Sequence, residues 1–372
     1  MVDTVKAKRA HSEIKPITGM RGIAALWVVA CHWAGPHWTG IGRDIALHGY
    51  AAVDLFMIMS GFVLGLAHAS HVGASVWHGY WRFLLSRLAR LYPLYLLTAL
   101  ASLVLWFTVE PDAGWITPGV VASNLLMADT TFWDVNALDG PSWAVSVEWT
   151  LNLFFPIFCL IGLRLSQRWT VAVALLCAGL LVLTSVLDAR WNGGVPGALG
   201  VLDNRLLYLR CGPEFTLGLL IWRWWEAAGR STRFGGSGWM LACVTAMVAC
   251  LPFKSMDLPF VLACCLLLPG LAEGRSPVAH WFAAGWMCWL GTISFSLYLW
   301  HAAFIPLRDG IAALSAGLGV MGAGVLANGV TLALVLAFSG LSYTWFEMPA
   351  RHWVRGWFTQ PRPVSPPHPA TR

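Results

Sequence analysis

Long apolar windows dominate this sequence of 372 residues, and they constrain its fold more than any other feature. A helix that crosses a bilayer needs about 20 apolar residues, because it rises only about 1.5 Å per residue. Ten windows approach that length, at residues 18–38, 49–69, 88–109, 141–163, 169–187, 205–225, 237–251, 258–272, 286–306 and 320–344. The pattern predicts an all-α, polytopic membrane bundle of about ten transmembrane helices. The seventh and eighth windows are the shortest, and an alternative is that they form one re-entrant pair.

The composition leaves no room for a separate soluble domain. Only 11% of the residues are charged, against about 25% in soluble domains. We therefore predict a cytoplasmic N-terminal segment at 1–17, one transmembrane domain at 18–349, and a basic, proline-rich, disordered cytoplasmic tail at 350–372. The nine cysteines lie mostly inside apolar runs, so we interpret them as reduced fillers and expect no metal site. The net charge of +6 is dispersed between apolar segments, which argues against a nucleic-acid partner.

The distribution of Lys and Arg predicts the orientation. With the N-terminus in the cytoplasm, 17 of the 24 cations fall in cytoplasmic segments, and four fall in outer loops, namely Arg43, Arg190, Lys254 and Arg308. The remaining three lie at or inside the ends of windows. The loop at 110–140 carries five acidic residues and no cation. By the positive-inside rule, both termini are predicted to be cytoplasmic.

Ionisable residues inside the windows mark a candidate functional region, because each costs a few kcal/mol in a bilayer. Residue counting places His32, Asp54, Glu148 and His301 at similar depth in the outer half of the membrane. His32, for example, lies about 14 residues, or about 21 Å, along an outward-running helix. A single buried histidine is often only a hydrogen-bond partner. Four ionisable groups at one depth predict an acid–base cluster instead.

A cationic group is predicted at the cytoplasmic end. Arg21 precedes His32 by eleven residues, which is about three helical turns, so both project from one face about 16 Å apart. Arg87 and Arg90 share a face at the start of the third window. Their guanidinium forks match phosphate oxygens, which favours an anion site formed by these three arginines. An alternative is that Arg87 and Arg90 only anchor their helix at the interface.

Three further groups of residues have weaker signals. Ser294, Tyr298 and His301 share a helical face, so we expect them to line one cavity. Arg210 and Glu214, four residues apart, are interpreted as an intrahelical ion pair. The outer loop contains aromatic residues among acids, which could stack on sugars, although we favour an interfacial role; they are Trp115, Phe132 and Trp133, beside Asp129, Asp134, Asn136 and Asp139.

Six segments, in order, carry a resemblance to acyltransferase family 3, the multi-span membrane O-acyltransferases. The first pairs Arg21 with His32, and the third contains Arg87 and Arg90 in the sequence Arg87-Leu88-Ala89-Arg90 followed by Leu91-Tyr92-Pro93. The second runs from Val53-Asp54-Leu55-Phe56 to Ser60-Gly61-Phe62, and the fourth from Ser142 to Glu148. The last two are Gly291–His301 and Ser342–Pro349. The similarity spans about residues 15–352, and the chain resembles the type without a C-terminal hydrolase-like domain.

The resemblance implies transfer of an acyl group, expected to be acetyl, from cytoplasmic acyl-CoA to a hydroxyl of an extracytoplasmic glycan. Arg21, Arg87 and Arg90 would bind the donor, and His32 would act as general base with Asp54 or Glu148 orienting its ring. An alternative mechanism acylates His32 itself. Ser60, Ser146, Ser294, Tyr298 and His301 would line the substrate cavity, with Ser146 and Tyr298 as candidate oxyanion donors. The implied location is a bacterial inner membrane, in contact with lipid.

Two alternative functions stay open at this stage. Some members of the family acylate small molecules such as macrolides, so the acceptor need not be a glycan. A proton-coupled transporter would also place ionisable residues inside a helical bundle. Against a transporter, the sequence has no two-fold internal repeat, and its arginines cluster at one end. The sequence does not fix the oligomeric state.

Overall fold

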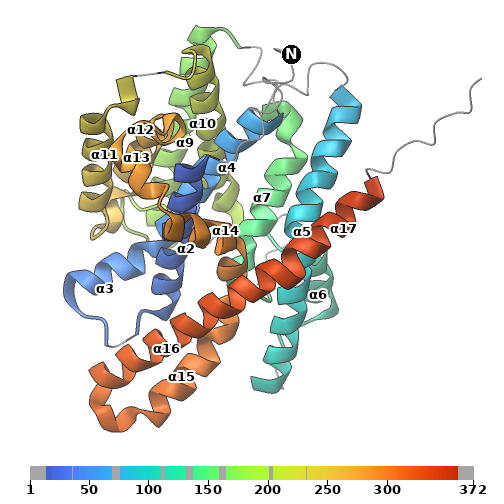
Figure 1. The fold of residues 1–372 in the computed structure, drawn as a ribbon, viewed down its shortest axis with the longest axis vertical. Coiled ribbons are helices and arrows are strands. Elements are labelled where there is room, and N and C mark those ends of the chain that lie inside the picture. The colour runs from blue at the N-terminus through green and yellow to red at the C-terminus, as the bar shows by residue number, and fades with distance from the viewer. Residues whose placement is uncertain are drawn as a thin grey trace, which may run out of the picture.

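A computed structural model describes residues 14–35, 37–68, 76–109, 114–130, 137–158, 165–200, 204–231 and 233–358. Within these ranges the chain forms helices and no strands. The principal helices are α2 (Lys15–Trp33), α3 (Gly40–Leu47), α4 (Ala52–His68), α5 (Val76–Val109), α6 (Pro118–Leu125), α7 (Trp143–Leu153), α9 (Gln167–Trp191), α10 (Asn204–Ala227), α11 (Ser237–Cys250), α12 (Asp257–Glu273), α13 (Pro277–Phe282), α14 (Gly285–Trp300), α15 (Ile305–Leu314), α16 (Gly319–Ser342) and α17 (Met348–Phe358). Figure 1 shows their arrangement.

Each predicted window coincides with a helix, but not every helix qualifies as a membrane span by length and composition. Five segments of the described chain qualify, namely Gly40–Ala67, Gly79–Val109, Gln167–Trp191, Lys254–Glu273 and Ala316–Trp357. A sixth is obtained if Gly285–Trp300 and Ala302–Leu314, which meet at 61°, form one broken span. The all-helical membrane fold is therefore confirmed, whereas ten spans and cytoplasmic termini stay predictions.

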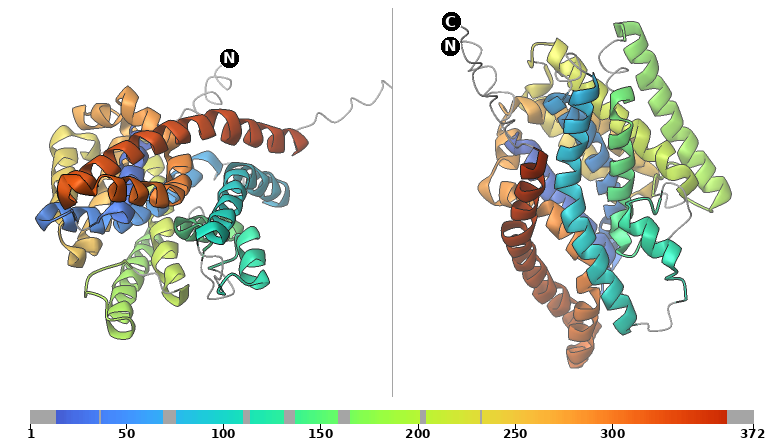
Figure 2. Two further views of the ribbon diagram at one scale, coloured as in Figure 1. Left: turned by 90° about the horizontal axis from the view of Figure 1, so that it is seen from below. Right: turned by 90° about the vertical axis from the view of Figure 1, so that its right-hand side faces the viewer.

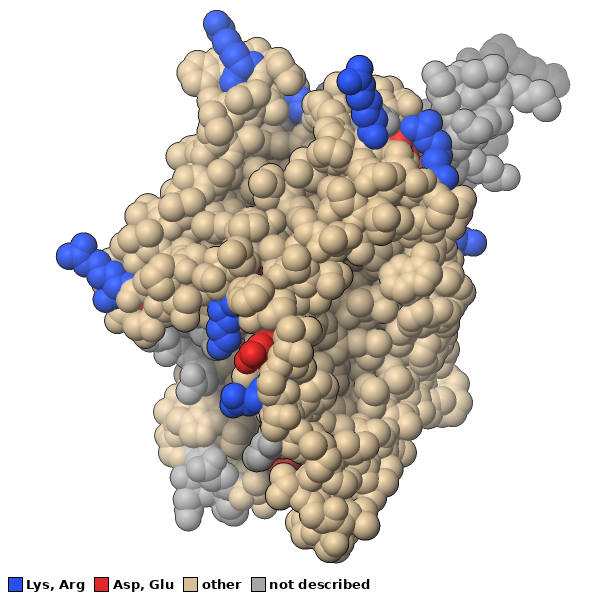
Figure 3. Space-filling view, turned by 90° about the vertical axis from the view of Figure 1, so that its left-hand side faces the viewer, with Lys and Arg blue, Asp and Glu red and all other residues tan. Residues whose placement is uncertain are grey.

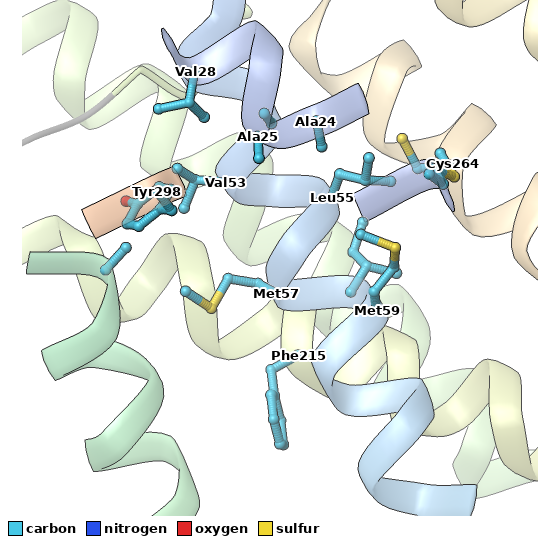
Figure 4. Packing of buried hydrophobic residues seen from close by; sticks show 14 of the residues in the cluster. Ala24, Ala25, Val28, Val53, Leu55, Met57, Met59, Phe215, Cys264 and Tyr298 are labelled. Atoms are coloured by element: carbon cyan, nitrogen blue, oxygen red, sulfur yellow. The ribbon is translucent and has the colours of Figure 1, made fainter. Parts of the chain in front are cut away.

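Helix α4 lies at the centre of the bundle because apolar residues surround its whole circumference. Figure 4 shows its side chains meeting residues of α2, α10, α12 and α14. Ile58 and Phe62 are fully buried, as are Ala51 and Ala52 at its start. A helix that is hydrophobic all round is expected to be enclosed by other helices. The central position of α4 brings one of its faces to the candidate site.

Helices α2 and α14 pack backbone to backbone because glycines face each other. A Cβ added at Gly291 would lie 1.9 Å from the carbonyl oxygen of Thr18, and one added at Gly22 would lie 2.6 Å from the Gly291 nitrogen. Small residues permit such close helix crossings in membranes. From this crossing, His32 and His301 are each ten residues further along the chain. Because the two helices run parallel, equal offsets bring these histidines together.

The outward faces of the bundle are apolar, as lipid-facing surfaces should be. Leu175 and Leu176 of α9 and Val320 and Val325 of α16 are among the exposed aliphatic residues. Figure 3 shows one face of the molecule, where a few charged side chains interrupt a largely uncharged surface. A water-soluble monomer rarely exposes so much contiguous apolar surface. This surface agrees with the predicted contact with membrane lipid.

Two predicted boundaries differ from the structure. The final helix was expected to end before residue 350, yet α16 continues through a π-helical turn at Tyr343–Glu347 into α17, which ends at Phe358. Figure 2 shows this long arm along the outside of the bundle. Residues 1–13 and 359–372 lie outside the described chain. Helix α7 begins at Trp143, after a 3-10 turn (Gly140–Ser142) whose Pro141 and Ser142 are already buried. It therefore starts inside the molecule.

Candidate active site

One cavity lies between α2, α4, α5, α7 and α14 and opens to the surface of the molecule. Helix α4 contributes a stripe at helical spacing, and the other helices contribute most of the polar groups. The lining residues are Arg21, Val53, Phe56, Met57, Met59, Ser60, Val63, Leu64, Arg87, Arg90, Leu91, Ala144, Val145, Glu148, Ser294, Phe295 and Tyr298. The cavity thus brings together all three predicted donor-binding arginines, with Ser60, Ser294 and Tyr298.

Arg87 is bound to a carboxylate on the cavity wall. Its Nη2 donates to Glu148 Oε1, and the Ser60 hydroxyl donates to the same oxygen over 2.9 Å. The Arg87 side chain is 8% exposed and that of Glu148 is 19% exposed. Glu148 therefore belongs to the arginine cluster, whereas residue counting had placed it at the depth of His32. The residue count was misleading because it started α7 at the outer membrane surface, whereas α7 begins inside the bundle.

Arg21 and Arg90 line the same cavity without a carboxylate partner. Within the described ranges, neither guanidinium forms a hydrogen bond or an ion pair. The cavity wall therefore carries three guanidinium groups and one carboxylate. Unpaired guanidinium groups beside one another repel, and a bound anion would relieve this repulsion.

His32 and His301 meet at the ends of α2 and α14. Their ring centroids are 4.9 Å apart, and His301 Nε2 lies 3.2 Å from His32 Nδ1. His301 is fully buried, whereas His32 is exposed. Tyr298 separates this histidine pair from the cavity: its side chain lines the cavity, and its ring centroid is 6.1 Å from that of His301. His301 is therefore not a cavity-lining residue, although it was expected to line the cavity with Ser294 and Tyr298 on the same helical face.

Asp54 is engaged with α10 instead of with His32. Both Nε and Nη2 of Arg210 lie 2.6 Å from Asp54 Oδ1, and Glu214 Oε1 lies 3.9 Å from Arg210 Nε. All three side chains are at most 1% exposed. The predicted Arg210–Glu214 pair is thus part of a buried group of three that links α4 to α10. Neither Asp54 nor Glu148 hydrogen-bonds the His32 ring, so the structure does not place either carboxylate where it could orient that ring.

Ser146 points toward a second buried polar cluster. Its hydroxyl donates to Asp129, and the Tyr95 hydroxyl is 3.5 Å away. Burial raises the pKa of Asp129, and it raises the pKa of the nearby Asp139 to about 8. Neither Asp139 oxygen has a hydrogen-bond partner. Ser146 is thus not positioned beside the cavity as an oxyanion donor, and the Tyr298 hydroxyl already donates to the Pro141 carbonyl over 2.8 Å.

The structure also describes one of the aromatic residues of the outer loop and eight of the nine cysteines. Trp115 packs against Trp106 with ring centroids 5.3 Å apart, and Phe132, Trp133, Asp134 and Asn136 lie outside the described residues. Eight described cysteines are free, and Cys159 lies outside the description. In the part of the chain that the structure describes, no group of His, Cys, Asp and Glu side chains has metal-binding geometry.

The family model described as "Acyltransferase domain" matches residues 14–344, which include the arginine-lined cavity and the histidine pair. The chain belongs to this acyltransferase family. It is thus an acyltransferase enzyme embedded in a membrane, and its helices carry the six motifs that the resemblance rested on.

Curated relatives are similar over most of the chain. "Acyltransferase MdmB" of Streptomyces mycarofaciens is 28% identical over 95% of both proteins. "Putative peptidoglycan O-acetyltransferase YrhL" of Bacillus subtilis is 23% identical over 92% of this chain and 55% of its own length. "Putative membrane-bound transacylase BcsY" of Komagataeibacter xylinus is 26% identical over 90% of this chain and 82% of its own length. No solved structure matches this chain.

Sequence reasoning missed the direct contacts between His32 and His301 and between Asp54 and Arg210. The equal ten-residue offsets from Gly22 and Gly291 were a usable signal for the first contact. The sequence held no signal for the contact between Asp54 and Arg210, because ion-pair partners on helices far apart in sequence depend on which helices pack together. The resulting site has an arginine-lined cavity toward one end of α2 and an imidazole at the other.

Proposed function

We propose that this protein transfers an acyl group, expected to be acetyl, from cytoplasmic acyl-CoA to a hydroxyl of an extracytoplasmic glycan. The observation that carries the proposal is the pairing of two sites along one uninterrupted helix. Arg21 faces the cationic cavity, and His32 lies eleven residues further along α2, about 16 Å away at 1.5 Å per residue. A long donor with an anionic end and a reactive end fits this separation.

The cavity suits the nucleotide end of coenzyme A. Phosphate oxygens accept charge-assisted hydrogen bonds from guanidinium groups, and Arg21 and Arg90 have no competing carboxylate. Apolar residues of α4, such as Val53 and Met57, line the rest of the cavity and suit an uncharged acyl-pantetheine arm. The arm would then extend toward Tyr298 and the histidine pair.

His32 would act as general base in the transfer step. The acceptor hydroxyl gives its proton to His32 Nε2 while its oxygen attacks the thioester carbonyl. The carbon–sulfur bond then breaks, and the coenzyme A sulfur leaves with the proton returned from the imidazolium. The products are an O-acyl ester and free coenzyme A. His32 suits this role because it is exposed and its Nε2 has no partner within the described chain.

A glycan acceptor is favoured by the similarity to a putative peptidoglycan O-acetyltransferase. We place the enzyme in a bacterial cytoplasmic membrane on the same grounds and on the predicted topology. Deletion of the gene should remove O-acyl groups from a surface polysaccharide, and the wild-type gene should restore them. Restoration by a His32→Ala variant at matched expression would contradict the role of His32.

Binding of coenzyme A separates this proposal from a transporter. Coenzyme A should raise the melting temperature of the purified protein in detergent or nanodiscs, because a ligand that binds only the folded state stabilises it. His32→Ala should bind coenzyme A as well as the wild type does, and it should lose about 100- to 10,000-fold in acyl transfer. Absence of any shift at millimolar coenzyme A would argue against an acyl-CoA donor.

A further inference from the structure

We propose that His301 is the positioning residue for His32, and that it replaces the carboxylate that usually accompanies a catalytic histidine. His301 Nε2 would accept the Nδ1–H of His32, which leaves His32 Nε2 with a free lone pair for the acceptor hydroxyl. The inference rests on the proposed role of His32 as general base, and it assigns a role to His301 that cavity lining does not provide.

Backbone carbonyls determine which nitrogens carry protons. His301 Nδ1 lies 2.7 Å from the Tyr298 carbonyl oxygen, and His32 Nδ1 lies 3.0 Å from the Val28 carbonyl oxygen. A carbonyl oxygen only accepts, so both Nδ1 atoms must carry hydrogen. In a neutral ring the other nitrogen then has a lone pair.

The contact between the rings agrees with this assignment. His301 Nε2 lies 3.2 Å from His32 Nδ1, so the lone pair of the first faces the N–H of the second. The opposite arrangement, with His301 Nε2 donating, would leave two lone pairs facing each other at His32 Nδ1 and the Val28 carbonyl. One tautomer of each ring satisfies all three contacts, with the single His32 Nδ1–H shared between the Val28 carbonyl oxygen and His301 Nε2. In that tautomer, His32 Nε2 is the basic nitrogen.

During transfer, the proton of the acceptor hydroxyl moves to His32 Nε2, and the ring becomes an imidazolium. The His32 Nδ1–H bond to His301 Nε2 then becomes charge-assisted and stronger, so it stabilises the transition state more than the ground state. His301 keeps its own Nδ1–H on the Tyr298 carbonyl. The proton on His32 Nε2 leaves with the coenzyme A sulfur, and both rings return to their starting tautomers.

In the described part of the chain, no carboxylate hydrogen-bonds either histidine ring. Tyr298 donates its hydroxyl to Pro141, and the Cys31 thiol donates to the Leu47 carbonyl. Arg308 of α15 approaches the pair from outside, where its Nη1 donates to the Trp33 carbonyl and its Nη2 pairs with Asp309. His37 contacts Asn328 through Nε2. These groups are thus engaged elsewhere, and among the described side chains His301 is the one that hydrogen-bonds a His32 ring nitrogen.

Three substitutions of His301 distinguish positioning from packing. Gln can place its side-chain oxygen near the position of Nε2 and accept from His32, whereas Asn can reach only the position of Nδ1 and bond the Tyr298 carbonyl. Ala does neither. Purified variants in nanodiscs would be assayed with acetyl-CoA and a soluble peptidoglycan fragment as acceptor probe, by release of free thiol and by mass of the ester. The exposed His280→Ala on α13, 21 residues before His301, is the matched control.

We expect His301→Ala and His301→Asn to lower kcat by about 10- to 100-fold, the range for a lost charge-assisted hydrogen bond. His301→Gln should recover most of that loss, and the KM for acetyl-CoA should stay unchanged in all three because His301 does not line the donor cavity. The acidic limb of the kcat/KM profile should move to lower pH in the Ala and Asn variants, since the imidazolium loses His301 as an acceptor and keeps only the Val28 carbonyl. His280→Ala should match the wild type.

Equal activity in the Ala, Asn and Gln variants would overturn the inference, and so would rescue by Asn rather than Gln. The melting temperature without ligand reports whether a variant folds, and its rise with coenzyme A reports donor binding. A variant that fails to fold is thus recognised, and the comparison of Gln with Asn then tests the inference. If wild-type protein makes no ester, or if His32→Ala keeps full activity, the proposed function itself fails. If the His301 variants behave like the wild type while His32→Ala is inactive, the general-base role of His32 stands without this partner.

Discussion

Arg87 and Arg90 lie one turn apart on α5, yet their surroundings differ. Arg87 is held by Glu148, whereas Arg90 lines the cavity without a carboxylate partner in the described chain. The sequence predicted the anion site because guanidinium pairs at helical spacing are recognisable in a linear pattern. It did not distinguish the two arginines, because the partner of Arg87 comes from another helix.

Arg90→Ala should weaken coenzyme A binding by about 10- to 100-fold, since one or two charge-assisted hydrogen bonds to phosphate are lost. The melting temperature without ligand should not fall, because no carboxylate is left unpaired. Arg90→Lys should recover only part of the affinity, as an ammonium lacks the planar fork. Isothermal titration and thermal unfolding measure the two quantities, and unchanged affinity in the Ala variant would return Arg90 to a topological role.

Arg87→Ala should behave differently from its neighbour. It leaves Glu148 on the cavity wall with only the Ser60 hydrogen bond, and breaking a largely buried pair typically costs about 3–5 kcal/mol. The melting temperature should therefore fall along with the affinity for coenzyme A. Adding Glu148→Gln should restore much of the stability and none of the affinity. A double variant that is as unstable as Arg87→Ala would show that the loss does not come from an unpaired Glu148 carboxylate.

Asp139 gives the protein a pH-dependent stability. Burial of its carboxyl group raises its pKa from 3.8 to about 8 in the folded state, so between these pH values the folded protein holds a proton that the unfolded chain has lost. Stability from this group is therefore complete below pH 4 and falls by about 1.4 kcal/mol per pH unit until about pH 8. Asp139→Asn should flatten this slope in melting curves from pH 5 to 9. An identical slope in the variant would contradict the assignment.

The apolar windows predicted where the helices lie better than they predicted the residue at which each helix begins. Each window has a helix within a few residues, because a continuous apolar run is a local property of the chain. The start of α7 inside the bundle was not predictable, since burial of the turn at Gly140–Ser142 depends on α5 and α14. That single displacement moved Glu148 from the expected His32 cluster to the arginines. The pairing of α2 with α14 depends likewise on glycines whose partners are remote in sequence.

Gly291→Ala should separate α2 from α14 and disturb the histidine pair. A Cβ at this position would lie 1.9 Å from the Thr18 carbonyl oxygen, and overpacking of this kind typically costs about 1–3 kcal/mol. Both the melting temperature and acyl transfer should fall. Gly285→Ala on the same helix is the control, because nothing lies within 4 Å of its added Cβ. Equal stability and activity of the two variants would show that the close crossing is not required.

In the whole molecule, the direction of the helices relates the two ends of the site to the two sides of the membrane. Helices α2 and α14 are parallel, as the Gly22–Gly291 and His32–His301 contacts require. The predicted topology also makes the first and ninth windows parallel, because both are odd-numbered. In this predicted topology, the cationic cavity would face the cytoplasm and the histidine pair would lie toward the outer side. The number of spans between these helices follows from the apolar windows and the orientation follows from the charge distribution, and both stay predictions.

This arrangement predicts that donor and acceptor enter from opposite sides. In sealed vesicles of known orientation, with acetyl-CoA on the cytoplasmic face only, acylation should appear when the acceptor probe is on the outer face. Ser60→Trp should abolish coenzyme A binding and transfer together, because an indole would fill the cavity that Ser60 lines. It should leave access to His32 intact, which labelling of the exposed imidazole by diethyl pyrocarbonate from the outer side would report. If transfer occurs only with both substrates on the cytoplasmic face, His32 opens to the cytoplasm and the acceptor is a metabolite of that compartment.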